Sequence, residues 1–193
     1  MGLFEYLQSI IAIVLGLAIT KLLQKVAWVF RGFQSTPGHW LVLVWSGLLL
    51  ITVLGYFWVF WRLFSSVSDM SIWIFIAFPF TQCALFYLVA EFLPVPAIQE
   101  GDFDLAGYFV DQRRPFLITL GLFWLHLNVM PHFAPLVGFE LNQTLIEMTL
   151  GWLILLPLLV GVRSKQWNWQ VSACAGYGFI FLSQELIQLA ISN

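Results

Sequence analysis

One stretch decides the fold class: residues 39–64 read HWLVLVWSGLLLITVLGYFWVFWRLF. It contains a single Lys, Arg, Asp or Glu side chain, that of Arg62. A transmembrane helix needs about 20 predominantly apolar residues to cross roughly 30 Å of hydrocarbon. Residues 39–64 are therefore predicted to form a membrane-spanning α-helix.

The composition of the whole chain points the same way. Hydrophobic residues make up 61% of the chain and charged residues 9%, whereas charged residues reach about 25% in soluble domains. With a mean hydropathy of +0.89, most side chains are expected to be surrounded by the lipid bilayer. The net charge of −2, without a basic stripe, gives nucleic-acid binding no electrostatic support.

The same length criterion predicts six spans, at about 3–30, 39–64, 71–93, 114–136, 141–163 and 167–191. Turn-forming residues separate most of them, as expected for short loops. Pro131 and Pro135 make the end of the fourth span irregular, so five spans with a re-entrant segment are the alternative. The predicted fold is an all-α, polytopic transmembrane helix bundle that forms a single domain over residues 1–193.

The basic residues predict an orientation. Loops after spans one, three and five lie on one side of a six-span protein, and seven of the eight basic residues fall there: Lys21, Lys25, Arg31, Arg113, Arg114, Arg163 and Lys165. Short loops rich in Lys and Arg stay in the cytoplasm. We therefore expect a cell (inner) membrane protein with both termini outside.

The loop between spans three and four, residues 94–113, is the longest polar passage. Pro94 and Pro96 end the third span, because proline cannot continue a helical hydrogen-bond ladder. Asp104 has the position and type of an N-cap, and Pro115 suits the first turn of the fourth span. Between them, one apolar helical face predicts a short amphipathic interfacial helix at the membrane surface; its members are Leu105, Tyr108 and Phe109.

This loop is also a candidate docking surface for a cytoplasmic partner protein. Its aromatic and basic side chains are the residue types that interfaces favour. The candidate residues are Tyr108, Phe109, Arg113 and Arg114.

Polar side chains near the outer ends of spans five and six form the first candidate site. By helical rise, Glu147 and Glu185 lie roughly 9 Å below the outer boundary. Two carboxylates that lie close together in low dielectric share a proton, so they predict an outward-facing vestibule for a small cation. The amides Gln143, Gln184 and Gln188 lie beside them. Alternatively, each glutamate side chain extends to the membrane–water interface or forms a hydrogen bond with a neighbouring helix.

A second polar group lies nearer the midplane, where span four carries His126 and Asn128 and span three carries Gln82. Antiparallel neighbouring spans would bring His126 and Gln82 together. A histidine at this depth can relay protons because it titrates near neutrality. The alternative is a lone histidine with its hydrogen bonds satisfied.

Motifs for membrane enzymes are missing from the sequence. It contains no His-Glu-x-x-His, no Gly-x-Ser-x-Gly and no phosphate loop. Cys83 and Cys174 lie within apolar runs without metal-ligand spacing. We therefore expect no enzyme activity, no cofactor and no metal.

Several short motifs carry a resemblance: the opening residues 3–6, Leu15-Gly16-Leu17-Ala18, and in the long loop Glu91, Leu93-Pro94, Asp104, Tyr108-Phe109, Arg113-Arg114 and Phe116. With these the chain resembles a group of small bacterial six-span inner-membrane proteins that have no assigned activity. The resemblance implies a bacterial inner membrane and no catalytic residues.

Two functions follow as hypotheses. The first is a transporter or channel subunit for a small cation or solute, which would use the outer vestibule. The second is a non-catalytic sensor or scaffold whose 94–114 loop docks a partner. Small residues in spans one and six permit close helix approach, so a homo-oligomer or another membrane partner is also open.

Overall fold

The computed structural model describes residues 3–32, 38–64, 71–95, 104–133 and 145–192; within these, the side chains of 3–5, 32, 59, 61–64, 131, 133, 145–148, 185 and 187–192 are outside the description. The described residues contain helices and no strands. The predicted all-α fold is therefore confirmed.

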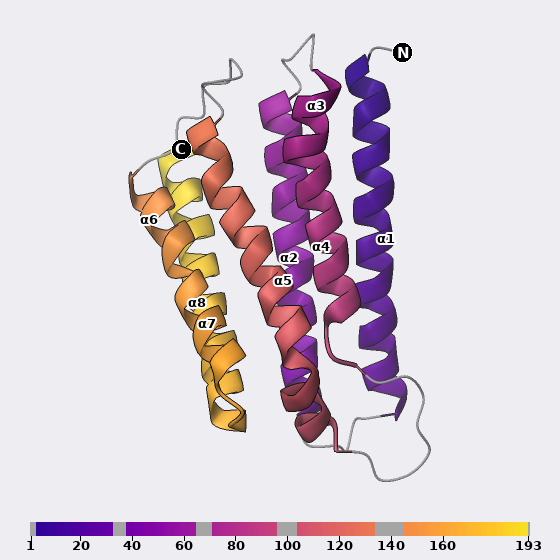
Figure 1. The fold of residues 1–193 in the computed structure, drawn as a ribbon, viewed down its shortest axis with the longest axis vertical. Coiled ribbons are helices and arrows are strands. Elements are labelled where there is room, and N and C mark those ends of the chain that lie inside the picture. Colours follow the sequence, from indigo (N-terminus) through magenta and orange to yellow (C-terminus); the bar gives the residue numbers. More distant parts are fainter. Residues whose placement is uncertain (1–2, 33–37, 65–70, 96–103, 134–144, 193) are drawn as a thin grey trace.

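The helices follow one another as α1 (Leu3–Gly32), α2 (His39–Phe64), α3 (Ile72–Phe75), the π-helical turn η1 (Ile76–Phe80), α4 (Thr81–Phe92), α5 (Leu105–Phe133), α6 (Leu145–Leu153), α7 (Leu155–Arg163) and α8 (Trp167–Ser192). Elements α3, η1 and α4 form one rod, and α6 and α7 form another. The rods run up and down, and both termini lie at the same end (Figure 1).

Three helices are long and apolar enough to cross a membrane: Tyr6–Arg31, His39–Trp58 and Ile72–Phe92. A shorter apolar helix covers Thr149–Arg163. These are properties of length and composition among the described residues. The prediction of six spans remains a prediction for the other rods.

The core is aromatic and joins α2, α5 and α8 around Tyr177. Its hydroxyl lies 3.2 Å from Thr52 Oγ1 and accepts a hydrogen bond from Trp124 Nε1 at 3.2 Å. The Trp45 ring packs on Tyr177 and on Phe116, with centroids 5.1 and 5.2 Å apart. Aromatic pairs of this kind contribute about 0.5–1.5 kcal/mol each beyond the area they bury.

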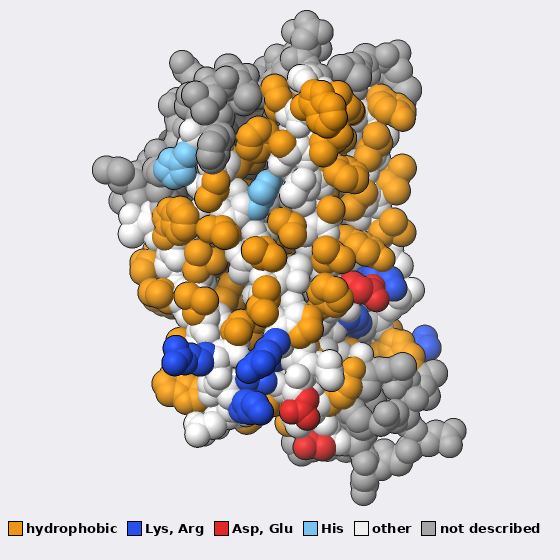
Figure 2. Space-filling view, in the orientation of Figure 1, with side chains coloured by type: hydrophobic (Ala, Val, Ile, Leu, Met, Phe, Trp, Pro, Cys, Tyr) orange, Lys and Arg blue, Asp and Glu red, His pale blue; other side chains and the backbone are white. Residues whose placement is uncertain are grey.

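The outer surface of the rods is apolar. Large hydrophobic side chains are exposed on the outer helices, among them Ile13, Leu54, Trp73, Leu122, Leu159 and Phe179. In Figure 2 they cover the middle of the molecule, whereas Lys and Arg side chains gather in its lower part. Soluble monomers rarely expose apolar patches this extensive, so the surface fits a lipid surrounding.

The first turns of α5 correct one prediction. Leu105 and Phe109 are buried, and the Phe109 ring lies 6.4 Å from those of Phe116 and Trp167. Residues 105–113 are thus the start of α5 and not a separate interfacial helix. Pro115 lies inside α5 and not in a first turn as predicted; it is exposed, so its missing N–H interrupts the ladder on the outer side of the helix.

Both ends of the long loop agree with the sequence in detail. Asp104 Oδ1 accepts a hydrogen bond from the Gly107 N–H at 2.9 Å, which confirms the predicted N-cap. Helix α4 ends at Phe92, just before Pro94.

Gly38 fixes the start of α2 against the starts of α5 and α8. Its φ of +92° is in the region that favours glycine. A Cβ at this position would lie 2.9 Å from Trp167 Cη2 and 3.0 Å from Ala106 Cβ. Only glycine therefore allows this close approach.

Candidate functional site

The predicted outer vestibule lies mostly outside the described residues. Gln143 and the side chains of Glu147, Glu185 and Gln188 belong to the undescribed part. The helices that carry them do pack together, because α6 contacts α8. Gln184 Oε1 is buried and has no hydrogen-bond partner among the described residues.

The predicted midplane residues Gln82, His126 and Asn128 are described, and His126 contacts the π-helical turn η1. Pro79 lies inside this turn, and its missing N–H and its ring prevent a regular α-helical ladder. The carbonyl oxygen of Ile76 accepts the backbone N–H of Thr81 and, at 2.6 Å, also its hydroxyl. π-helical turns often mark functional sites.

Two further carbonyl groups of η1 bond to side chains from neighbouring helices. The Ala77 oxygen lies 2.9 Å from His126 Nε2 on α5, and the Pro79 oxygen accepts the Tyr56 hydroxyl of α2 at 3.3 Å. Irregular backbone at membrane depth needs such partners, because lipid supplies none. The interruption in the third rod is therefore satisfied by α2 and α5.

His126 and Gln82 meet as the sequence predicted. Gln82 is fully buried, and its Oε1 lies 2.5 Å from His126 Nδ1. Its Nε2 donates to the carbonyl oxygen of Phe123 at 3.2 Å. This second bond fixes the amide orientation, because the reversed amide would place two acceptors face to face.

The imidazole of His126 thus lies between two acceptors, Gln82 Oε1 and the Ala77 carbonyl oxygen. A neutral imidazole has one N–H donor, whereas the protonated ring has two. Both hydrogen bonds form together only when the ring carries both protons. Since His126 is half-buried, this group is reachable from the outer surface of the bundle.

Asn128 belongs to a different contact. It lies two residues after His126, about 200° around the helix, and its Nδ2 donates to the Gly151 carbonyl oxygen at 2.8 Å. A Cβ on Gly151 would lie 2.0 Å from Asn128 Oδ1. The midplane residues therefore form two sites on opposite faces of α5, one toward α4 and one toward α6.

No protein-family model, curated protein or solved structure matches this chain. The resemblance to small bacterial six-span proteins therefore stays a prediction. Among the described residues, no group of three or more His, Cys, Asp or Glu side chains could hold a metal ion.

The predicted docking residues face in different directions. Phe109 and Arg113 are buried, Tyr108 is half-buried and Arg114 is exposed. The apolar anchor of the predicted docking surface thus packs inside the bundle.

Arg113 forms a contact that sequence reasoning missed. Its Nε donates to the Gly161 carbonyl oxygen at 3.0 Å and its Nη2 to that of Val162 at 3.4 Å, and Nη1 contacts the Val110 oxygen. Gln170 Nε2 donates to the carbonyl oxygens of Gly161, at 2.9 Å, and Ser164, at 2.8 Å.

Together Arg113 and Gln170 cap the C-terminus of α7, whose carbonyl groups carry partial negative charge. Burial, reinforced by the charge of Arg114, lowers the pKa of the Arg113 guanidinium. Arginine nevertheless stays protonated in proteins. No sequence motif predicts this cap, because its donors and acceptors come from three helices, α5, α7 and α8.

A similar contact closes the C-terminus of α4. Lys25 Nζ donates to the Leu93 carbonyl oxygen at 2.6 Å and also contacts that of Glu91. Lys21 Nζ lies 3.0 Å from Glu91 Oε2. Two lysines of α1 thus hold the end of the neighbouring rod.

Proposed function

We propose that the protein is a multi-pass protein of a bacterial inner membrane that moves a small cation, in the simplest case a proton, and that His126 is the group that takes up and releases it. The observation that carries the proposal is the position of the imidazole between two acceptors, at 2.5 and 2.9 Å. The three apolar helices and the apolar outer surface support a membrane protein. The basic end of the bundle would face the cytoplasm, with both termini outside.

An ionisable side chain within a membrane span is costly and is typical of ion and proton pathways. In the protonated state His126 bridges α5 to both η1 and α4. Loss of either proton removes one donor, so Gln82 Oε1 or the Ala77 oxygen loses its hydrogen bond. Proton release would thereby loosen α5 from the interrupted rod.

Beside the interruption, α2 carries the titratable residue Tyr56 and α4 carries Cys83, the residue after Gln82; Tyr87 and Glu91 lie further along α4. Tyr56 is joined to the same turn through Pro79. The side chains of Tyr56 and Cys83 are neutral in their ordinary state at physiological pH. His126 is therefore the group of this cluster that would carry the charge.

The outer vestibule with Glu147 and Glu185 enters the proposal as a second, separate cation site. Each site is tested by its own substitution.

Proteoliposomes with an internal pH-sensitive dye test the proposal under an imposed membrane potential. His126→Gln keeps an amide donor but cannot titrate, and it should abolish proton flux. His132→Gln is the matched control, because His132 is an exposed histidine near the end of the same helix. Unchanged flux in His126→Gln, or no flux in the wild type, would overturn the proposal.

Glu147→Gln and Glu185→Gln test the vestibule in the same assay. If they reduce flux while His126→Gln does not, the pathway follows the vestibule and the role of His126 is structural. The alternative function, a non-catalytic sensor or scaffold with a docking loop, ranks second. Of its four residues, Phe109 and Arg113 are inside the bundle.

A further inference from the structure

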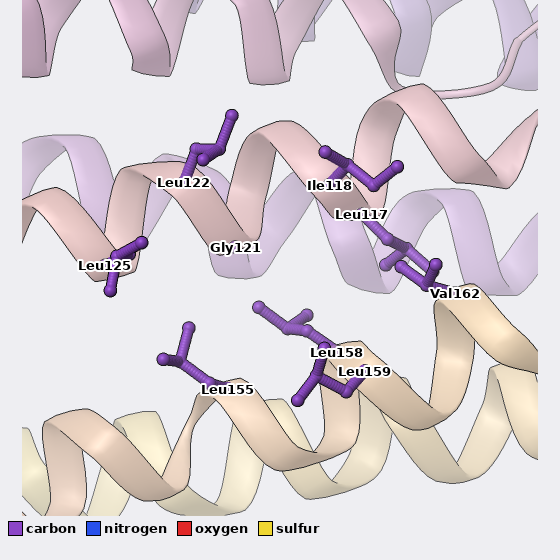
Figure 3. A pocket seen from close by; sticks show the side chains of 9 residues that line it. All are labelled: Leu117, Ile118, Gly121, Leu122, Leu125, Leu155, Leu158, Leu159 and Val162. Carbon is purple, nitrogen blue, oxygen red and sulfur yellow. The ribbon is translucent and has the colours of Figure 1, made fainter.

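A groove lies between α5 and α7 and opens sideways. Its volume is about 240 Å³, and its lining residues are Leu117, Ile118, Gly121, Leu122, Leu125, Leu155, Leu158, Leu159 and Val162. Figure 3 shows the lining side chains on α5 and α7, with Leu155 and Leu158 pointing from α7 toward α5. From Leu117 to Leu125 the helical rise gives a length of roughly 12 Å.

The groove belongs to the apolar outer surface. Ile118, Leu122 and Leu159 are 49%, 48% and 64% exposed. At the lining residue Gly121, a Cβ would meet no atom within 4 Å, so the space beside it is open. In a bilayer this opening faces the lipid acyl chains.

The lower end of the groove is basic. Arg114 lies four residues before Ile118 on α5, and Arg163 lies four residues after Leu159 on α7. Residues four apart share a helix face, so each arginine continues one wall of the groove by a turn. Both arginines are exposed.

Arg113 Nη2 contacts the Val162 carbonyl oxygen, so the start of α5 and the end of α7 lie side by side at the basic end of the groove. Exposed guanidinium groups on both walls at the end of an apolar groove suit a phosphate whose hydrocarbon chain lies in the groove.

We infer that this groove binds an anionic phospholipid, with one acyl chain between α5 and α7 and the phosphate on Arg114 and Arg163. The apolar walls select a hydrocarbon chain and the two arginines select negative charge. The site is independent of proton movement at His126, which faces α4.

Native mass spectrometry of the protein, reconstituted with phosphatidylglycerol or phosphatidylcholine and released into detergent, tests the site. The wild type should retain one phosphatidylglycerol in preference to phosphatidylcholine. Gly121→Leu fills the groove and should abolish retention. Gly16→Leu is the matched control, because a Cβ on Gly16 also meets no atom within 4 Å.

The double substitution Arg114→Gln, Arg163→Gln should remove the preference for phosphatidylglycerol while retaining some lipid. Equal retention of both lipids by the wild type would overturn the inference. Undiminished retention by Gly121→Leu would do the same, provided its thermal unfolding matches that of Gly16→Leu. Glycerol phosphate should not displace the lipid; displacement would show a headgroup site without an acyl-chain groove and would also overturn it.

Discussion

The contact between Asn128 and Gly151 permits a quantitative test of how α5 and α6 pack. In Gly151→Ala the added Cβ would lie 2.0 Å from Asn128 Oδ1, so the amide must rotate away. That rotation forfeits the 2.8 Å hydrogen bond to the Gly151 carbonyl oxygen. An interhelical hydrogen bond in a membrane contributes about 1 kcal/mol, and a buried carbonyl without a partner costs about 1–3 kcal/mol.

Alanine also gains about 1 kcal/mol over glycine as a helix former. The net effect of Gly151→Ala is therefore a loss of about 1–3 kcal/mol, from the difference between these contributions. In the Asn128→Ala background the clash is absent, and the same substitution should be neutral or stabilising. The two substitutions should thus couple by about 1–3 kcal/mol.

The assay is a double-mutant cycle of unfolding free energies in mixed detergent micelles, followed by circular dichroism. Gly47→Ala is the control, since a Cβ there meets no atom within 4 Å. Additivity within about 0.5 kcal/mol would show that the residues act independently. That result would refute the packing argument.

Three further predictions concern the cap, the tight start of α2 and the buried thiols. Gly38→Ala should lower the free energy of unfolding by about 1–3 kcal/mol, because a positive φ is costly for alanine and the Cβ has no room, whereas Gly16→Ala should not; equal unfolding temperatures would contradict this. Arg113→Met should destabilise the protein by about 1–3 kcal/mol, because the Val162 carbonyl group loses this donor while Gly161 keeps its bond from Gln170, and Arg113→Lys by less, as measured by thermal unfolding; equal losses would show that the side-chain volume dominates. Cys83 and Cys174 are buried, so a maleimide should label neither thiol before denaturation, and rapid labelling of the native protein would contradict their burial.

The helices and one polar pair could be predicted from the sequence because they depend on local pattern and depth. Apolar length predicted the long helices, and Asp104 marked the start of α5. The contact between His126 and Gln82 could be predicted because the two residues lie at similar depth on antiparallel neighbouring helices, where few other polar side chains are available as partners. Each of these inferences needed only neighbouring residues or a rule about the bilayer.

Other features depend on contacts between distant parts of the chain. The sequence placed Phe109 on an apolar face but did not show that Trp167 covers it. The π-helical turn around Pro79 bonds to Tyr56 and His126, which come from other helices. The role of Arg113 depends on Gly161, 48 residues later. Residue type and spacing carry no information about such pairings.

The buried Arg113 has a consequence for the order in which the protein assembles. Its carbonyl partners on α7, and Gln170 beside them, are synthesised after α5. Until α7 is in place, the guanidinium keeps its water or a lipid phosphate, because an unpaired buried charge is costly. Arg113 therefore gains its final partners only when α7 packs against α5, and a chain cut before Gly161 would leave the guanidinium without them.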